Sequence, residues 1–493
     1  MHDVAIVGLG PTGATLANLL AQQGLKVVVF DREADIYQLP RAIHFDGECM
    51  RVFQAVGIAS MLEPQLVVSP GMKFVNRAGQ VMIDWSRPTD IGPMGWHPSY
   101  RFHQPSLEAA LRRRLGEHAN VEVRLRHDVF AIEDQPHGVE LRFEDLASGR
   151  LLRTQAKFVV GCDGARSIVR RFMGTELEDL QSHERWLVVD VLLQRERPDL
   201  GDHSIQFCDP ARPSTYVRGV GNRRRWELML MPGDDPATIT RPESIWALLS
   251  RWVGPQEATL ERPAVYTFHS VVARGWRRGR MLLAGDAAHQ TPPFMGQGMC
   301  AGIRDASNLA WKLGAVVRGE QPQSLLDTYE SERSPHVREF IETAVRLGGV
   351  IQTTDPEVAD RRDADFARQP QVFSTPQPPL GPGFHEGGAH GGRLAPQAVG
   401  ADGARTDDRV GYAFALVVAA STADAARQAV EGRHRLVVAD RPELARWLEA
   451  LGALAVLVRP DRYVAGVARH VDDLPRLLRM RGSPALRPSP ALA

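Results

Sequence analysis

The sequence lacks several features that would place the protein in a special class. No apolar run approaches the roughly 18 residues that a membrane-spanning helix requires. Lys plus Arg and Asp plus Glu number 59 each, so no net charge favours nucleic acid or an anionic membrane. The chain begins without the basic segment and cleavage site of a signal peptide. We therefore expect a cytoplasmic protein whose partner is a small molecule.

Cysteine is scarce and scattered. The four cysteines are Cys49, Cys162, Cys208 and Cys300. None has CxxC spacing, which argues against a disulfide framework and against a zinc site, so no metal is expected. The remaining composition, 43% hydrophobic and 24% charged, is typical of a globular protein. A length of 493 residues predicts two or three domains.

Glycine is abundant, and three glycines near the start of the chain form a recognisable motif. An apolar strand predicted at residues 4–7 leads directly into Gly8, Gly10 and Gly13, and a helical pattern follows. This is the first turn of a dinucleotide site, in which the helix N-terminus faces a pyrophosphate. A second strand ends in Asp31, whose carboxylate can bind a ribose hydroxyl. The predicted contacts are Gly8, Gly10, Pro11, Thr12, Gly13, Asp31 and Arg32.

Two later segments identify the nucleotide as a flavin. A strand ends in Asp163-Gly164, with Ser167 as a predicted helix cap and Arg170 as a cationic donor. Another predicted strand, which begins at Met281, ends in a turn that contains Asp286, whose carboxylate can bind the ribityl hydroxyls of FAD. The next helix then offers its positive N-terminus to the flavin ring. The predicted contacts from this third motif are Gly285, Asp286, Pro293, Gly296, Gly298 and Met299, whereas His289 is read as a structural hydrogen-bonding residue.

The three motifs occur in the order and spacing of the single-component FAD-dependent aromatic hydroxylases, which the chain resembles. Further segments are similar to the branch that contains the 3-(3-hydroxyphenyl)propionate hydroxylases and phenol hydroxylases. They include residues 40–43 (Pro-Arg-Ala-Ile), 186–190 (Trp-Leu-Val-Val-Asp) and 457–461 (Leu-Val-Arg-Pro-Asp). The resemblance runs nearly from end to end.

The residue pattern and the resemblance together predict an α/β fold. A Rossmann-like FAD-binding domain occupies residues 1–175 and 275–373, and a mixed β-sheet substrate domain is inserted at 176–274 with part of 64–104. A linker rich in Pro and Gly follows at 374–403. Residues 404–493 have the βαβαββα order of a thioredoxin-like domain. That domain contains no cysteine, which excludes dithiol exchange.

The resemblance also implies the chemistry. FAD is reduced by NADH or NADPH and adds O2 as a C4a-hydroperoxide, whose distal OH is transferred to an electron-rich ring. Asp46 matches the active-site carboxylate of phenol hydroxylases and is predicted to act as base or hydrogen-bond partner, with His44 as a weaker candidate. The alternative for Asp46 is a helix N-cap. Arg41 and Gln104 are expected beside the flavin.

The predicted substrate is a phenolic acid such as 3-hydroxyphenylpropionate, hydroxylated ortho to its hydroxyl group. Arg41, Arg212 and Arg218 are candidates to bind the carboxylate. Cys300 stands where many relatives carry Asn, which leaves open whether a side-chain amide contacts the flavin. A buried structural thiol is the preferred reading of Cys300.

Other readings remain open at this point. A tailoring hydroxylase or epoxidase of a larger polyketide would use the same flavin motifs. A dithiol flavin reductase is disfavoured because the chain has neither a second GxGxxG motif nor a paired redox cysteine motif. A non-enzymatic flavin-binding sensor is disfavoured by the elaborate substrate domain. No nucleic-acid or membrane partner is expected, and the sequence permits a homodimer.

Overall fold

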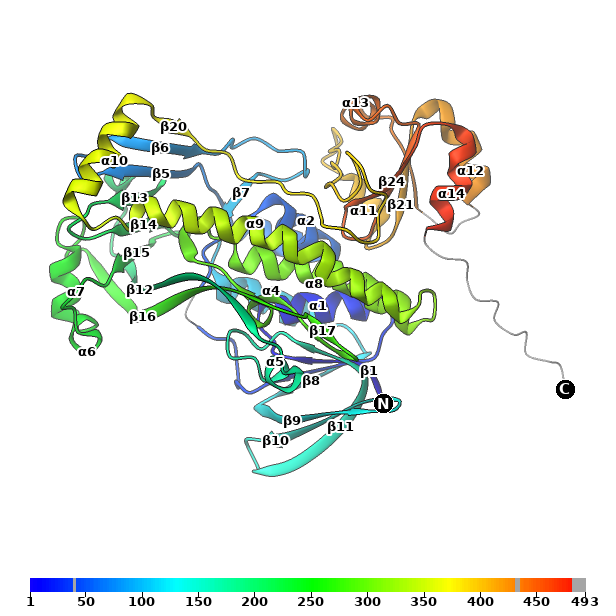
Figure 1. The fold of residues 1–493 in the computed structure, drawn as a ribbon, viewed down its shortest axis with the longest axis horizontal. Helices are drawn as coiled ribbons and strands as arrows, with labels where there is room; N and C mark the ends of the chain where they lie inside the picture. Colours follow the sequence, from blue (N-terminus) through cyan, green and yellow to red (C-terminus); the bar gives the residue numbers. More distant parts are fainter. Residues whose placement is uncertain (39–40, 431–434, 481–493) are drawn as a thin grey trace.

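The computed structural model describes residues 1–38, 41–430 and 435–480. Pro40, part of one segment quoted above, lies outside the described residues, as does the end of the predicted third domain after residue 480. Three bodies are visible in Figure 1, and the long helix α9 (Asp327–Ile351) runs between them. No helix within the described ranges combines the length and the hydropathy needed to cross a membrane.

The first body is a parallel sheet built where apolar runs alternate with helices. Its strands lie in the order β8, β2, β1, β11 and β18, with β17 antiparallel at the edge. Their bounds are β1 (His2–Val7), β2 (Val27–Asp31), β8 (Val121–Leu125), β11 (Arg150–Gly161), β17 (Arg277–Arg278) and β18 (Met281–Leu283). Helix α1 (Pro11–Gln22) packs against α4 (Gln104–Leu115) and α8 (Gly298–Val317). This is the predicted Rossmann-like arrangement.

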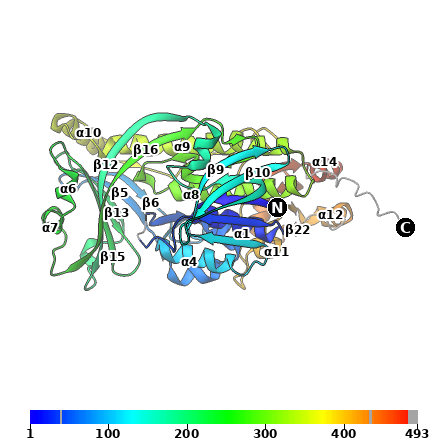
Figure 2. The same ribbon diagram turned by 90° about the horizontal axis from the view of Figure 1, so that it is seen from below.

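An antiparallel extension lengthens this sheet. Strands β9 (His127–Gln135) and β10 (Gly138–Asp145) pair with each other, and β10 pairs with β11. The helix α5 (Ile168–Met173) follows the Asp163 turn. Figure 2 shows β9 and β10 alongside the parallel strands.

The second body is a nine-stranded sheet in the order β19-β16-β12-β15-β14-β13-β5-β6-β20. Most neighbours are antiparallel, but β13 with β5 and β6 with β20 are parallel, so the predicted mixed sheet is confirmed. Helices α6 and α7 pack on one face over a separate apolar core. The bounds are β5 (Gly71–Asn76), β6 (Val81–Ser86), β12 (Leu177–Leu193), β13 (Ser204–Cys208), β14 (Ser214–Arg218), β15 (Arg223–Met229), β16 (Ala258–Ala273), β19 (His289–Gln290), β20 (Gln371–Val372), α6 (Pro236–Ile239) and α7 (Pro242–Leu249).

A small three-stranded sheet lies between the first two bodies. Strand β7 (Ser99–Arg101) is its centre, flanked by β3 (His44–Asp46) and β4 (Val67–Val68). Helix α2 (Gly47–Val56) begins directly after β3, followed by α3 (Ala59–Leu62). This sheet matters because it carries the residues predicted to contact the substrate.

The third body has the predicted thioredoxin-like order. Its sheet runs β22-β21-β23-β24, with β21 parallel to β22 and antiparallel to β23. The bounds are α11 (Thr406–Val410), β21 (Ala415–Val418), α12 (Ala423–Val430), β22 (Arg435–Val438), α13 (Pro442–Ala450), β23 (Ala455–Val458), β24 (Val464–Ala468) and α14 (Leu474–Arg479), and α10 (Pro356–Arg368) precedes them in the chain.

A buried ion-pair network fastens the third body to helices α8 and α9. Glu332 of α9 accepts hydrogen bonds from Lys312 Nζ of α8 at 2.7 Å and from Arg459 Nη2 at 2.7 Å. Arg459 also donates to Asp461 Oδ2 at 2.6 Å. All four side chains are at most 1% exposed. Although burial opposes ionisation, Arg459 and Lys312 hold the pKa of Glu332 far below its usual range.

We predict that Glu332→Gln lowers the free energy of unfolding by about 3 kcal/mol, because it leaves two buried cations, Lys312 and Arg459, with Asp461 as the one remaining carboxylate of the network. Equilibrium denaturation in urea measures this. The folded-state pKa of Glu332 is depressed, so its contribution is present above an unfolded-state pKa of about 4.3 and is lost as pH falls toward the folded value. Arg427→Ala, which breaks an exposed pair with Asp424, is the control and should have little effect. Equal effects of the two variants would contradict the role of the network.

Candidate active site at the flavin-binding turns

The first glycine turn is required by close backbone contacts. Gly8 has a φ of +101°, and a Cβ there would lie 2.4 Å from the carbonyl oxygen of Cys162. A Cβ on Gly13 would lie 2.0 Å from the carbonyl oxygen of Gly8. At Gly10, by contrast, a Cβ would meet no atom within 4 Å, so this residue faces open space at the N-terminus of α1. That end of the helix therefore has room for a phosphate group.

Asp31 ties the second strand to the glycine turn. Its Oδ2 accepts a hydrogen bond from Leu9 N at 2.8 Å, and its Oδ1 accepts one from Glu33 N at 2.9 Å. The carboxylate thus lies beside the turn, as predicted for a ribose contact. Arg32 is exposed and pairs with Glu33 at 3.4 Å.

Asp163 orders the second motif. Its Oδ2 accepts from Ile168 N at 2.6 Å, while its buried Oδ1 has no hydrogen-bond partner among the described residues. Ser167 caps α5 by accepting from Arg170 N at 3.0 Å, as predicted. Arg170 Nη1 donates to the carbonyl oxygen of Ala287 at 2.8 Å, which joins the second motif to the third.

Thr12 joins the first motif to the third. A Cβ on Gly285 would lie 2.8 Å from Thr12 Oγ1, and one on Gly302 of α8 would lie 2.3 Å from the same atom. Gly302 therefore lets α8 approach α1, and Gly285 lets the Asp286 turn approach α1. Together with the contact between Gly8 and Cys162, this places all three motifs around one location.

Asp286 is the free carboxylate at that location. It is exposed between the buried residues Gly285 and Ala287, and it has no hydrogen-bond partner within the described part of the chain. The surrounding protein nevertheless desolvates the group and raises its pKa, opposed by His289 and Arg41. The Asp286 side chain is reached by solvent and is also surrounded by protein, so it lies in a recess of the surface. Its oxygens can accept hydrogen bonds from the hydroxyl groups of a ligand, which fits the ribityl chain of FAD.

His289 is structural, as predicted. It is buried and its Nε2 lies 2.6 Å from Asp305 Oδ2. Asp305 also accepts from Gly285 N at 3.0 Å and from Arg333 Nε at 2.9 Å. This buried network fixes the turn that presents Asp286. The sequence prediction missed Asp305 and Arg333, because charged residues in a helical pattern are usually solvated.

The segment before α8 leaves its helix N-terminus open. Gly296 has a φ of +64°, and a Cβ on Gly298 would meet no atom within 4 Å. Neither a capping side chain nor an acidic residue satisfies the first turn of α8. Pro293 and Met299 are half-buried here. These free N–H groups are able to stabilise negative charge on a ligand at this end of α8.

Asp46 has two roles in the structure. Its Oδ1 accepts from Cys49 N at 3.1 Å, so the helix-cap alternative is confirmed. Its Oδ2 accepts from Arg304 Nη2 at 2.5 Å, and Arg304 Nε donates to Glu48 Oε2 at 2.5 Å. Although burial opposes ionisation, the Arg304 guanidinium and the Cys49 amide hold the pKa of Asp46 at about 2. Asp46 is therefore a permanent anion at neutral pH.

His44 lies beside the flavin-binding loop. Its Nδ1 is 3.4 Å from the carbonyl oxygen of Gly296, and its Nε2 accepts from Arg87 Nη1 at 2.7 Å. Burial and the Arg87 charge lower the pKa of His44 to about 3. The imidazole is thus neutral, with its Nε2 lone pair already engaged.

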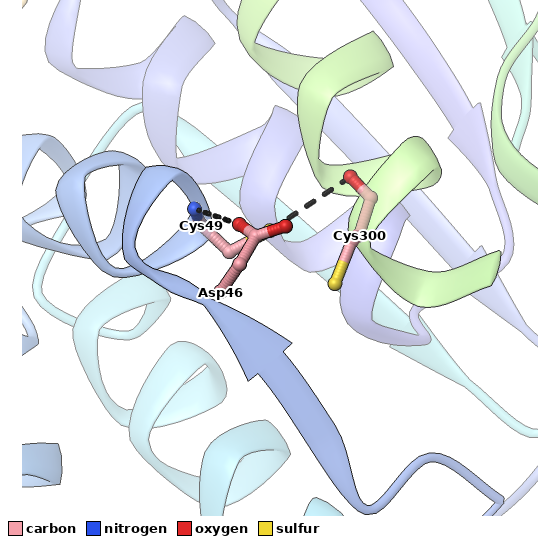
Figure 3. A group of neighbouring side chains, drawn as sticks. All are labelled: Asp46, Cys49 and Cys300. Atoms are coloured by element: carbon pink, nitrogen blue, oxygen red, sulfur yellow. Dashed lines mark hydrogen bonds between the residues drawn. The ribbon is translucent and has the colours of Figure 1, made fainter. Parts of the chain in front are cut away.

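Cys49 and Cys300 lie next to Asp46 (Figure 3). One ligand atom from each of the three residues lies within 4.8 Å of the others. The Cys49 thiol donates to the carbonyl oxygen of Cys300 at 3.8 Å, and both thiols are free and buried. Burial raises the pKa of the Cys49 thiol well above its usual value. The cluster is explained by hydrogen bonding, with the carboxylate held by Arg304.

Gln104 holds the loop that carries Arg41. Its Oε1 accepts from Arg41 N at 2.9 Å and from Ala42 N at 2.7 Å, and its Nε2 donates to Glu108 at 2.9 Å. The amide is thus engaged within the protein. Arg41 itself is exposed, with its guanidinium 5.1 Å from the Tyr37 ring centroid.

Comparison with known proteins agrees with this geometry. A family model described as FAD binding domain matches residues 1–344. The chain is 38% identical over 499 residues to a probable NADH-specific resorcinol 4-hydroxylase of Rhodococcus jostii (strain RHA1), covering 96% of this chain and 93% of that protein. It is 34% identical to a 3-(3-hydroxy-phenyl)propionate/3-hydroxycinnamic acid hydroxylase of Burkholderia cenocepacia (strain HI2424), covering 94% and 93%.

A solved structure shares the whole fold. The flavin-dependent monooxygenase PieE, in complex with FAD and substrate, superposes with a TM-score of 0.83 at 23% identity, covering 97% of this chain and 98% of that one. The chain therefore belongs to the FAD-binding-domain family of flavoprotein monooxygenases. It is an FAD-dependent oxidoreductase.

We predict that the purified protein is yellow from noncovalent FAD and that Asp286→Ala weakens FAD binding by about 10- to 100-fold. That range corresponds to the loss of charge-assisted hydrogen bonds. Reconstitution of the apoprotein, followed by flavin fluorescence, measures the dissociation constant. Asp440→Ala, at an exposed position of the third body, is the control. An unchanged FAD affinity of Asp286→Ala would refute the ribityl contact.

Proposed function

We propose that the protein hydroxylates a monocyclic phenol at the position next to its existing hydroxyl group. NADH or NADPH and O2 are consumed, one oxygen atom enters the ring and the other leaves as water. Bound FAD supplies the activation of dioxygen and the transfer of one oxygen atom. Both relatives described above bear names of hydroxylases of monocyclic phenols. This favours a small phenol over the larger polyketide class.

The observation that carries the proposal is the ionised Asp46 beside the flavin-binding loop. Its side chain keeps 15% exposure although its partner Arg304 is buried. A carboxylate with a pKa of about 2 is a weak proton acceptor but a good hydrogen-bond acceptor. Asp46 therefore accepts a hydrogen bond from the phenol hydroxyl and makes the ring more electron-rich. In this proposal His44 links Arg87 to the Gly296 carbonyl of the flavin-binding loop and does not take up a proton.

The third body is proposed to stabilise the enzyme and not to transfer electrons. It has no cysteine, and it contacts α8 and α9 through buried ion pairs and through an apolar cluster that includes Trp311 of α8. Tyr463, directly before β24, connects the third body to the site, because its hydroxyl donates to Glu48 Oε1 at 2.7 Å. The predicted homodimer and cytoplasmic location stay predictions.

We predict that Asp46→Asn retains FAD and its helix cap but slows hydroxylation by about 10²-fold, because the negative charge facing the phenol is lost. Product formation in a single turnover measures the rate. The wild-type rate should show no carboxylate ionisation between pH 4 and pH 7, since the pKa of Asp46 is about 2. Asp235→Asn, at the cap of α6, is the matched control. If Asp46→Asn forms product at the wild-type rate, Asp46 is a structural cap alone.

A further inference from the structure

Two buried arginines between the flavin-binding loop and the nine-stranded sheet have incomplete hydrogen bonding. Arg101 of β7 is 1% exposed and donates through Nη2 to the carbonyl oxygen of Asp202. Its Nε and Nη1 have no partner in the described chain. The Nε of Arg87 is buried and unpartnered in the same way. A buried cation with unsatisfied donors is unfavourable unless a hydrogen-bond acceptor, best an anion, binds those donors.

Two more arginines add to the positive charge. Arg218 of β14 and Arg224 of β15 are paired in the sheet register. Burial first, and then the charges of Arg218, Arg224 and Arg87, lower the pKa of Arg101 to about 10. Among the described residues, Asp202 is the one carboxylate that forms an ion pair with Arg87, Arg101, Arg218 or Arg224. It pairs with Arg218 and is 63% exposed. The cluster therefore carries an excess of positive charge.

The cluster lies next to the proposed site of chemistry. Arg101 is the cross-strand partner of His44, and Arg87 donates to both His44 and Ser99. His44 in turn contacts Gly296 of the flavin-binding loop. A molecule held by Arg87 and Arg101 is thus close to His44 and to the flavin-binding loop at Gly296.

The other arginines considered from the sequence are already engaged or lie elsewhere. Arg212 donates to Asp234 Oδ2 at 2.5 Å. Arg41 is exposed beside Tyr37. Arg218 alone of the three belongs to the cluster, at its solvent-facing side. The predicted carboxylate contact of Arg212 is therefore replaced by an internal ion pair.

We propose that Arg87 and Arg101, supported by Arg218 and Arg224, form a binding site for the carboxylate of the substrate. This inference rests on the proposed function and narrows it. The substrate is a monocyclic phenol that carries a short carboxylate side chain, and not a neutral phenol such as resorcinol. A guanidinium fork matches the two oxygens of a carboxylate, and such charge-assisted pairs are strong where water is excluded.

The test is a binding titration that does not need turnover. Oxidised holoenzyme is titrated with 3-hydroxyphenylpropionate and with resorcinol, followed by calorimetry and flavin absorbance. Wild type should bind the acid at least 10-fold more tightly than resorcinol. Arg101→Met should weaken binding of the acid at least 10-fold and that of resorcinol less than about 3-fold, with Arg101→Lys between. Arg212→Met, which removes a paired arginine from the connection between β13 and β14, should leave both affinities unchanged.

Thermal unfolding separates binding from a structural role. Replacing an unpaired buried cation by an apolar side chain of similar volume should leave the melting temperature of Arg101→Met unchanged or raise it. A large drop in melting temperature with equal loss of both ligands would overturn the inference. Equal wild-type affinity for acid and resorcinol, with resorcinol hydroxylated, would overturn it and leave the proposed function intact. Binding of the acid that depends on Arg101, with no phenol hydroxylated, would overturn the proposed function and support the anion site.

Discussion

The bridge that Arg304 makes between Asp46 and Glu48 is the interaction on which the site depends. Arg304 belongs to α8, the helix whose N-terminus faces the flavin position, whereas Asp46 and Glu48 belong to the β3–α2 junction. The guanidinium bonds both carboxylates and, with the Cys49 amide, keeps the pKa of Asp46 low although burial opposes its ionisation. The bridge thus fixes the position of Asp46 relative to α8. It also keeps that carboxylate charged at neutral pH.

The same bridge extends into the third body. Tyr463 donates to the second oxygen of Glu48, and its hydroxyl lies 3.4 Å from His336 Nε2 of α9. A second anchor, Arg51 with Asp407, ties α2 to α11 at 2.6 Å. The thioredoxin-like body is therefore joined to the helix that follows Asp46. This explains how a domain without redox cysteines can matter for the geometry of the site.

Several residues have roles that local sequence could not reveal. The resemblance placed Gln104 and Arg41 beside the flavin, and the structure adds that Gln104 holds the backbone of Arg41. Asp46 matched both a helix cap and an active-site carboxylate, and the structure gives it the cap and an Arg304 pair at once. Arg87 and Arg101 carried no motif. They become notable because their unsatisfied donors are buried together, a property of packing across three strands from distant parts of the chain.

The sequence by itself determined the flavin-binding turns and the order of the three bodies. Those features depend on local backbone chemistry: the glycines at Gly8 and Gly13 fit contacts that no side chain could tolerate, and strand alternation sets the sheets. Tertiary structure decided which charges meet. In sequence, nothing distinguishes Arg304, Glu332 and Arg101 from other charged residues. In the fold, Arg304 is buried against Asp46, and Glu332 is buried against Arg459 of the third body. Arg101 is buried with two unsatisfied donors. Desolvation depends on the whole fold, so no short segment encodes it.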